Sequence, residues 1–182
     1  MTLPLTSRTL WTLIALISAA LATASLALTP LLDLDPCHLC IFQRLLFMIL
    51  ALLAALTAAL QHPGRPLLAA RLSGLTLLPI AALGGGVAAY QSWLQWQPAD
   101  SISCVGGPPG PIERLVEWLG QQVPSLFMAS GFCEDRELTI LGLSLANWSF
   151  LFFIAILVVG AWLLWRDRRE PNPRKRRGRD HS

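Results

Sequence analysis

The sequence predicts an all-α membrane protein, in which four transmembrane helices form a bundle and a short helix lies at the membrane interface. Apolar residues make up 54% of the chain and charged residues only 14%, whereas soluble domains have roughly 45–50% and about 25%. Mean hydropathy is +0.54, and four runs have the length of about 20 residues that a bilayer-spanning helix needs. So few charges could not cover a soluble globule, and the apolar fraction excludes disorder.

Four apolar runs define the predicted spans, at residues 10–29, 41–60, 72–90 and 141–165. Only Arg44 places a charge inside them. Each run is too long for a strand, and a helix satisfies its own backbone in lipid. The first run also resembles a secretory signal peptide, with Arg8 before it, but it exceeds the usual apolar segment of about 7–15 residues. We therefore expect residues 1–165 to form one four-helix transmembrane domain.

The distribution of Lys and Arg orients this bundle. Of fourteen such residues, eleven lie in residues 1–9, 61–71 and 166–182, and two lie in the loops 30–40 and 91–140. Because loops rich in Lys and Arg stay in the cytoplasm, both termini are expected there. The two loops are then expected on the outer side of the membrane. The absence of long loops fits a bacterial protein, in which this side is the periplasmic side of the inner membrane.

The tail at residues 166–182 is basic enough to suggest nucleic-acid binding. Directly after a span, however, such a segment also fixes topology and contacts anionic lipid. Pro171 and Pro173 argue against folded structure. We expect a disordered cytoplasmic tail that contacts the lipid bilayer, and no nucleic-acid partner.

All four cysteines fall in the two loops predicted to be periplasmic. Cys37 and Cys40 form a C-x-x-C where the second span begins, and Cys104 and Cys133 lie in the longer loop. The periplasm is oxidising, so disulfides are expected. Zinc binding and structural disulfides are the alternatives, but Cys104 and Cys133 form no second C-x-x-C. A bridge across two residues constrains the unfolded chain little, so redox function is favoured and no metal is expected.

Two features favour a thiolate at Cys40. It lies at the N-terminal end of a predicted helix, where the helix dipole favours negative charge. Arg44 follows four residues later on the same helix face, and a nearby cation also favours the reactive thiolate. An Arg inside a span is a functional-site candidate, although its side chain could instead extend to the headgroups. His38 could tune the cysteines when charged, and Gln43 could simply fill a helix–helix contact.

The longer loop contains a predicted interfacial helix over residues 111–120. It begins with a proline and ends with a glycine, as helices do. Its apolar residues recur at helical spacing, at Ile112, Leu115, Val116 and Leu119. Such a helix lies in the membrane surface with its apolar face down, and would hold the cysteines of this loop near the membrane.

Two motifs resemble the DsbB family, the bacterial inner-membrane enzymes that reoxidise the periplasmic oxidant DsbA. Residues 37–44, Cys-His-Leu-Cys-Ile-Phe-Gln-Arg, match its C-x-x-C with an Arg four residues after the second Cys. Residues 124–133 resemble its P-x-x-F-x-A-S-G-x-C, and Leu141-Gly142-Leu143 with Trp148 follow as in the family. The resemblance covers nearly the whole chain. One departure is Gln91, where family members often have a His linked to the quinone site.

The resemblance implies redox disulfides Cys37–Cys40 and Cys104–Cys133. It further implies a DsbA-like thiol oxidant as partner and the membrane quinone pool as electron acceptor, with ubiquinone expected ahead of menaquinone. Arg44 is then expected to bind the quinone, with Gln91 as a second contact.

Three alternatives remain. The chain could be a DsbB-like enzyme for a dedicated partner, or a non-catalytic membrane protein stabilised by disulfides. The vitamin K epoxide reductase-like class also combines four helices, a C-x-x-C and quinone, but its C-x-x-C lies on a later helix.

Overall fold

The computed structural model describes residues 6–61, 67–97, 110–133 and 138–169. Within these ranges the chain forms six helices and one two-stranded hairpin. In chain order the elements are α1 (Ser7–Leu31), α2 (His38–Leu60), α3 (Leu67–Leu94), α4 (Pro111–Gln122), α5 (Pro124–Phe127), β1 (Thr139–Ile140), β2 (Leu143–Ser144) and α6 (Leu145–Arg169). By length and composition, α1, α2, α3 and α6 could each cross a membrane.

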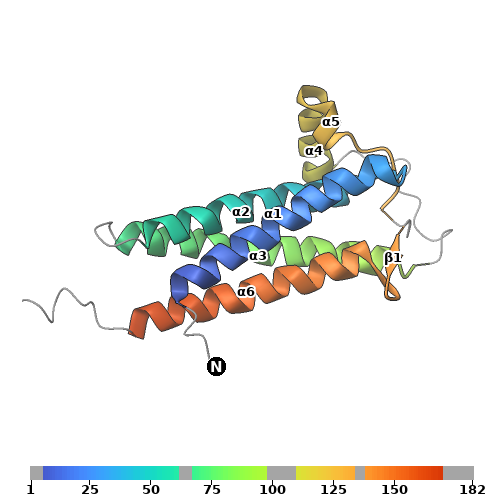
Figure 1. The fold of residues 1–182 in the computed structure, drawn as a ribbon. Helices are drawn as coiled ribbons and strands as arrows, with labels where there is room; N and C mark the ends of the chain where they lie inside the picture. The colour runs from blue at the N-terminus through green and yellow to red at the C-terminus, as the bar shows by residue number, and fades with distance from the viewer. Residues whose placement is uncertain (1–5, 62–66, 98–109, 134–137, 170–182) are drawn as a thin grey trace, which may run out of the picture.

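The four long helices run side by side as an elongated bundle (Figure 1). α1 packs on α2, α2 on α3 and α3 on α6, and a smaller contact joins α1 to α6. The short helices α4 and α5 lie outside the bundle near one of its ends, with α4 against α2 (Figure 1). The predicted fold, an all-α four-helix membrane bundle with a short interfacial helix, is confirmed.

Side chains cap the first turns of α1 and α2. Thr6 Oγ1 accepts the Thr9 N–H at 3.2 Å, and Cys37 Sγ accepts the Cys40 N–H at 3.4 Å. Each bond satisfies one of the N–H groups that a helix leaves unpaired at its start. The N-cap of α2 is therefore a cysteine that the sequence assigns to redox chemistry.

A hairpin precedes α6, which begins at Leu145 rather than at residue 141 where the predicted span starts. Its connecting residues, Leu141 and Gly142, have φ angles of 54° and 79°, and two such residues form the type I′ turns that suit hairpins. The register pairs Thr139 with Ser144 and Ile140 with Leu143. Because the hairpin residues are largely apolar, hydropathy alone extends the predicted span across them.

Two aromatic rings pack closely where α2, α3 and α6 meet. Phe47 and Phe153 stack with their centroids 4.2 Å apart, and Phe153 is fully buried. Gly84 of α3 lies so close to the Phe153 ring that a β-carbon would overlap it, whereas a β-carbon on Gly86 would meet nothing within 4 Å. Of the Gly84-Gly85-Gly86 triplet, position 84 is thus the one at which α6 requires the absence of a side chain.

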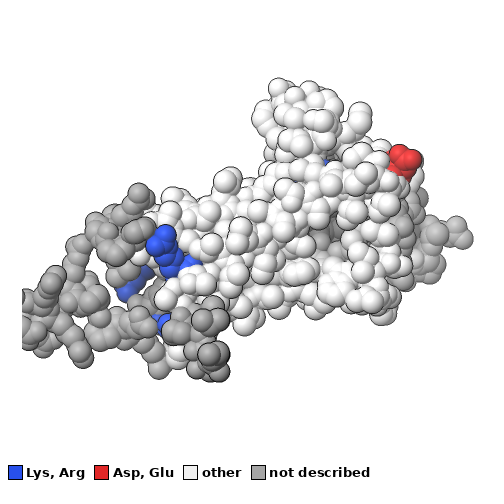
Figure 2. Space-filling model, viewed as in Figure 1, with Lys and Arg blue, Asp and Glu red and all other residues white. Residues whose placement is uncertain are grey.

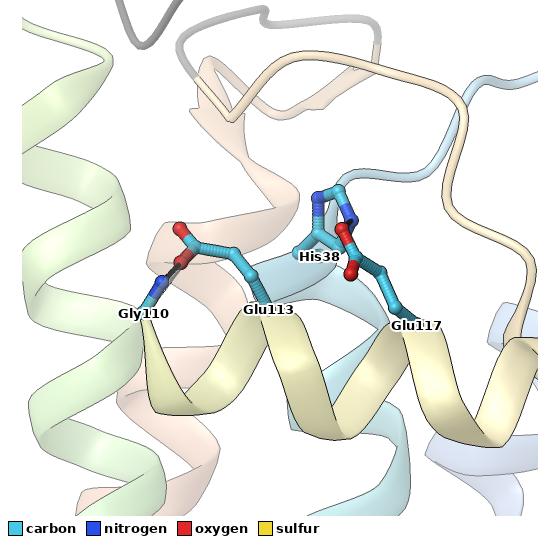
Figure 3. A network of polar contacts seen from close by, with 4 residues as sticks. All are labelled: His38, Gly110, Glu113 and Glu117. Atoms are coloured by element: carbon cyan, nitrogen blue, oxygen red, sulfur yellow. Dashed lines mark hydrogen bonds and ion pairs between the residues drawn. The ribbon is translucent and has the colours of Figure 1, made fainter. Parts of the chain in front are cut away.

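Two polar contacts of α4 lie near the start of α2, and one of them reaches His38 of α2 (Figure 3). The Gly110 N–H donates to the Glu113 carboxylate at the first turn of α4. Glu117, one turn later, points toward His38, with Oε1 3.9 Å from His38 Nε2 (Figure 3). When His38 is protonated, these two groups form an ion pair between the longer loop and the residue inside the C-x-x-C.

The apolar residues of α4 divide between the protein and its surroundings. Val116 is fully buried, and Ile112 and Leu119 pack partly buried against the core. Leu115 and Trp118 remain 40% and 56% exposed. The predicted apolar face is therefore partly occupied by α2, and the remainder is available for the membrane surface, as in interfacial helices.

Charged side chains lie at the two ends of the bundle (Figure 2). Among the described residues on the face shown, Lys and Arg gather where α1 starts and α6 ends, and Asp and Glu lie at the opposite end. The cysteines described below lie at the acidic end, near the start of α2.

Candidate functional site

Three of the four cysteines meet at the N-terminal end of α2. Cys37 Sγ lies 3.3 Å from Cys40 Sγ, and Cys37 also shares a hydrogen bond with Cys133. The Leu39 backbone N–H, in the first turn of α2, is a further hydrogen-bond partner of Cys133. Cys37 is 2% exposed and therefore lies, nearly inaccessible, between the other two sulfurs. Cys104 lies outside the described residues, so the pair Cys104–Cys133 stays a prediction.

The segment before Cys133 is docked on the loop before Cys37. The Ser130 and Gly131 N–H groups donate to the Pro36 carbonyl at 3.0 and 3.4 Å. Ser130 Oγ donates to Asp35 Oδ1 at 2.8 Å. Gly131 lies directly against the Asp35 carbonyl, where a β-carbon would overlap the oxygen. This docking brings Cys133 to Cys37 across 96 positions of sequence.

The contact between Cys37 and Cys133 shifts the pKa values of the two thiols in opposite directions. The hydrogen bond from the Cys37 thiol lowers the pKa of Cys133, and the Leu39 N–H adds to this effect. The pKa of Cys37 is raised, chiefly by its hydrogen bonds with Cys133 and Cys40 and then by burial. A thiol that donates to a neighbouring sulfur favours the thiolate of that neighbour. The arrangement therefore favours a Cys133 thiolate that faces Cys37.

The Arg44 guanidinium is buried, 4% exposed, and its hydrogen-bond partners are all neutral. Its Nε donates to Ser25 Oγ at 3.1 Å, and one terminal nitrogen donates to Thr29 Oγ1 at 2.8 Å and to the Ser25 carbonyl at 3.3 Å. The other terminal nitrogen donates to the Leu126 carbonyl in α5 at 2.9 Å. Arg44 is also close enough to Cys40 for a Coulombic interaction. This cation is therefore held by protein oxygens, near the C-x-x-C.

Gln91 of α3 lies beside the same sulfurs. Its Nε2 donates to Cys40 Sγ at 2.9 Å and is 3.5 Å from Cys37 Sγ. Its Oε1 accepts a hydrogen bond of 2.6 Å from Gln43 Nε2. Gln91 and Gln43 are 2% and 3% exposed, so both amides are removed from water.

A cavity of about 350 Å³ adjoins Cys40 and is bounded by residues of α1, α2, α3 and α6. Its volume falls within the range of about 300–1,000 Å³ that is usual for small-molecule sites. Apolar and aromatic side chains form most of the lining, with Arg44, Gln43 and Gln91 at its polar part. The aromatic residues in the lining are Phe47, Phe132, Trp148 and Phe152.

The structure thus brings together five residues singled out from the sequence, namely Cys37, Cys40, Arg44, Gln91 and Cys133. Sequence reasoning missed the acceptors that hold Arg44, the residues that dock Cys133, and the role of Gln43 beside Gln91. One signal was available for Arg44, because Ser25 and Thr29 are hydroxyl residues four positions apart in the second half of the first predicted span, a spacing that shares one helix face.

Comparisons with known proteins agree with the family resemblance of the sequence motifs. The family model described as "Disulfide bond formation protein DsbB" matches residues 7–163. A "Disulfide bond formation protein B" of Dechloromonas aromatica (strain RCB) is 44% identical over 149 residues, which are 82% of this chain and 87% of that protein. Another, of Polaromonas sp. (strain JS666 / ATCC BAA-500), is 39% identical over 158 residues, 87% of this chain and 90% of that protein.

Proposed function

This chain belongs to the DsbB family of disulfide bond formation proteins, a family of membrane disulfide oxidoreductases, and we propose that it reoxidises a periplasmic DsbA-like thiol oxidant and passes the electrons to a membrane quinone. The single observation that carries this proposal is the contact of Cys133 with Cys37, beside a cavity lined by Cys40 and Arg44. It joins cysteines of two loops to a site that a membrane-soluble molecule can occupy.

The first exchange takes place in the longer loop. A thiolate of the partner attacks Cys104 of a Cys104–Cys133 disulfide, so that a mixed disulfide forms and Cys133 leaves as the thiolate. Thiol–disulfide exchange is favoured when the leaving thiol has a low pKa. Among the contacts that lower the pKa of Cys133, the hydrogen bond from the Leu39 backbone N–H does not require a Cys37 thiol, and it supports the role of Cys133 as the leaving sulfur.

The second exchange transfers the disulfide between loops. The Cys133 thiolate attacks Cys37 of the oxidised C-x-x-C, the Cys37–Cys40 bond breaks, and its electron pair stays on Cys40. The contact of Cys133 with Cys37 and the 3.3 Å separation of Cys37 Sγ from Cys40 Sγ support this order. Cys40 lines the cavity together with Arg44, and its charge interacts with that cation, so the negative charge forms next to it.

The cavity fits a quinone head group. Its apolar and aromatic lining suits a flat ring, and Arg44 and Gln91 provide hydrogen-bond donors at its polar part. When bound, a quinone supplies a two-electron sink, which is needed because DsbA-type oxidants have potentials of about −120 mV. Arg44 stabilises negative charge on Cys40. We propose ubiquinone ahead of menaquinone.

The distribution of charge supports an orientation in the bacterial inner membrane. The acidic end of the bundle (Figure 2) carries the cysteines and faces the periplasm in this proposal, and both termini lie in the cytoplasm. Residues 1–165 then form the membrane domain, and residues 166–182 form a basic tail at the anionic inner leaflet.

Anaerobic mixing of a reduced DsbA-like protein with the purified protein and ubiquinone tests the proposal. We expect two partner thiols to be lost for each quinol formed, and no quinol formation in the Cys40→Ser variant. Continued quinone reduction by Cys40→Ser would exclude this route. Cys104→Ser should yield no mixed disulfide with the partner, and an adduct trapped on Cys133 instead would reverse the assigned order.

Arg44→Ala tests the quinone site. We expect a higher apparent KM for quinone, because the variant lacks a buried cation beside the cavity. Arg114→Ala is the matched control, since Arg114 is an exposed arginine on α4. Equal KM values for the two variants would remove Arg44 from the proposed site.

A further inference from the structure

We propose that Gln91 is a catalytic hydrogen-bond donor to the Cys40 sulfur, and that Gln43 is a positioning residue that orients its amide. This inference rests on the proposed function, which determines the step at which negative charge forms on Cys40. When Cys133 bonds to Cys37, the Cys37–Cys40 bond breaks and its electron pair remains on Cys40 Sγ. This sulfur already faces an N–H group of Gln91. The two glutamines thus provide a neutral thiolate-binding unit, distinct from the Arg44 cation.

The direction of the Gln91 amide follows from its two partners. A side-chain amide has an acceptor at one corner and two donors at the other. Gln91 Oε1 is engaged by Gln43 Nε2 at 2.6 Å, and Nε2 faces Cys40 Sγ at 2.9 Å. An amide rotated the opposite way would place two N–H donors against each other at the Gln43 contact. With Gln43 Nε2 facing Gln91, the orientation in which Gln91 donates to sulfur is the one that satisfies both contacts.

Burial makes this donor effective. Gln91 and Gln43 are almost fully removed from solvent, and hydrogen bonds are electrostatically stronger in such surroundings than in water. The backbone N–H of Cys40 donates to the sulfur of Cys37, because Cys37 is the N-cap of α2. This N–H of α2 is thus engaged by Cys37, and the side chain of Gln91 in α3 donates a hydrogen bond to the Cys40 sulfur.

The thiolate-to-thiol ratio of Cys40 tests the inference without quinone or partner protein. The full-length protein carrying Cys37→Ser, Cys104→Ser and Cys133→Ser retains Cys40 as its sole cysteine. The ultraviolet thiolate absorbance lost on alkylation gives the ratio at a fixed pH. In the Gln91→Met variant we expect the ratio to fall about tenfold, which corresponds to about 1.4 kcal/mol, because the methionine side chain cannot donate a hydrogen bond to the thiolate.

Three further variants separate this role from a structural one. Gln91→His retains a nitrogen donor and should restore the ratio toward that of the parent. Gln43→Met should lower the ratio less than Gln91→Met does, and should lower it no further when Gln91→Met is already present, since coupled residues give non-additive effects. Gln121→Met on the exposed face of α4 is the matched control, and should leave the ratio unchanged.

Two results would overturn the inference. A parental ratio in Gln91→Met would show that the amide does not stabilise the thiolate, and additive effects of the two substitutions would show that Gln43 does not act through Gln91. If Gln91→Met does not fold, the thiolate-to-thiol ratios of Gln43→Met and Gln121→Met still test the inference. A lower ratio in Gln43→Met supports it, and equal ratios contradict it. Because no quinone is present, failure of quinone turnover and failure of this inference are separate outcomes.

Discussion

The carbonyl oxygen of Asp35 lies directly against the backbone of Gly131, in the space that a β-carbon would occupy. Asp35 is two residues before Cys37, and Gly131 is two residues before Cys133. The side-chain bond from Ser130 to Asp35 reinforces the same approach. Contact between the two reactive sulfurs therefore depends on an absent side chain at position 131.

Gly131→Ala should slow disulfide exchange between the loops. The added methyl group must separate Asp35 from Gly131, and displacement of reacting groups by about 1 Å can cost a factor of about 100 in rate. In a protein with Cys40→Ser and Cys104→Ser, the rate of Cys37–Cys133 disulfide formation under a mild oxidant measures this step. Gly86→Ala is the control, because its β-carbon meets open space. Equal rates in the two variants would show that the docked arrangement does not limit exchange.

Thr29→Val should destabilise the fold around Arg44. It removes the acceptor that Thr29 Oγ1 offers to the buried guanidinium at 2.8 Å. We expect a loss of about 1–2 kcal/mol in unfolding free energy, between the about 0.6 kcal/mol of neutral intramembrane bonds and the about 1.5–3 kcal/mol of bonds to charged groups. Unfolding in mixed detergent micelles measures it. Thr23→Val is the control, since exposed Thr23 bonds only carbonyls of its own helix, and an equal loss there would argue against a specific role for Thr29.

Cys133 should remain reactive at lower pH than an ordinary thiol. Its pKa is lowered chiefly by the hydrogen bond with Cys37, so its thiolate, the form that reacts, persists as the pH falls below the usual value of about 8.5. In reduced Cys104→Ser protein, alkylation of Cys133 as a function of pH, followed by peptide mass spectrometry, gives its profile.

Cys37→Ala should move this profile to higher pH, because the largest cause of the lowering is lost. Cys40→Ala is the matched comparison: the charge of Cys40 raises the pKa of Cys133, so its removal should not move the profile upward. A profile for Cys133 that is insensitive to Cys37→Ala would contradict the hydrogen-bonded pair.

Gly84→Ala should destabilise the bundle by about 1–3 kcal/mol, the usual cost of inserting a group into a packed core. The new methyl group would overlap the Phe153 ring, which stacks on Phe47 at the cavity. Gly86→Ala on the same helix should be neutral or slightly stabilising, because alanine favours helices by about 1 kcal/mol over glycine. Similar unfolding midpoints for the two variants would show that Phe153 adjusts without cost.

Features that depend on neighbouring residues could be predicted from the sequence. The four apolar runs predicted the bundle, and the spacing of Cys40 and Arg44 predicted their common helix face. The start of α6 was missed because Leu141 and Leu143 are apolar in a hairpin as well as in a span. Local hydropathy contains no information on the positive φ angles that reverse the chain there.

Features that depend on packing between helices or loops could not be predicted. The position of Cys40 at the start of α2 suggested that the helix N-terminus acts on this cysteine. In the structure, the backbone N–H groups of Cys40 and Leu39 instead contact Cys37 and Cys133. Gln43 looked like a generic helix contact, because nothing in its spacing indicates that Gln91 of α3 lies opposite. The docking of Gly131 on Asp35 likewise depends on the path of two separate loops.

The oxygens around Arg44 come from two hydroxyl groups and two peptide carbonyls. None of these groups takes up a proton in the range in which carboxylates titrate, near pH 4. Had a carboxylate been the partner of Arg44, acidification of the medium outside the cell would discharge it and alter the field at Cys40. With peptide and alcohol oxygens in its place, the charge of the groups that bind Arg44 does not change as the surroundings become acidic.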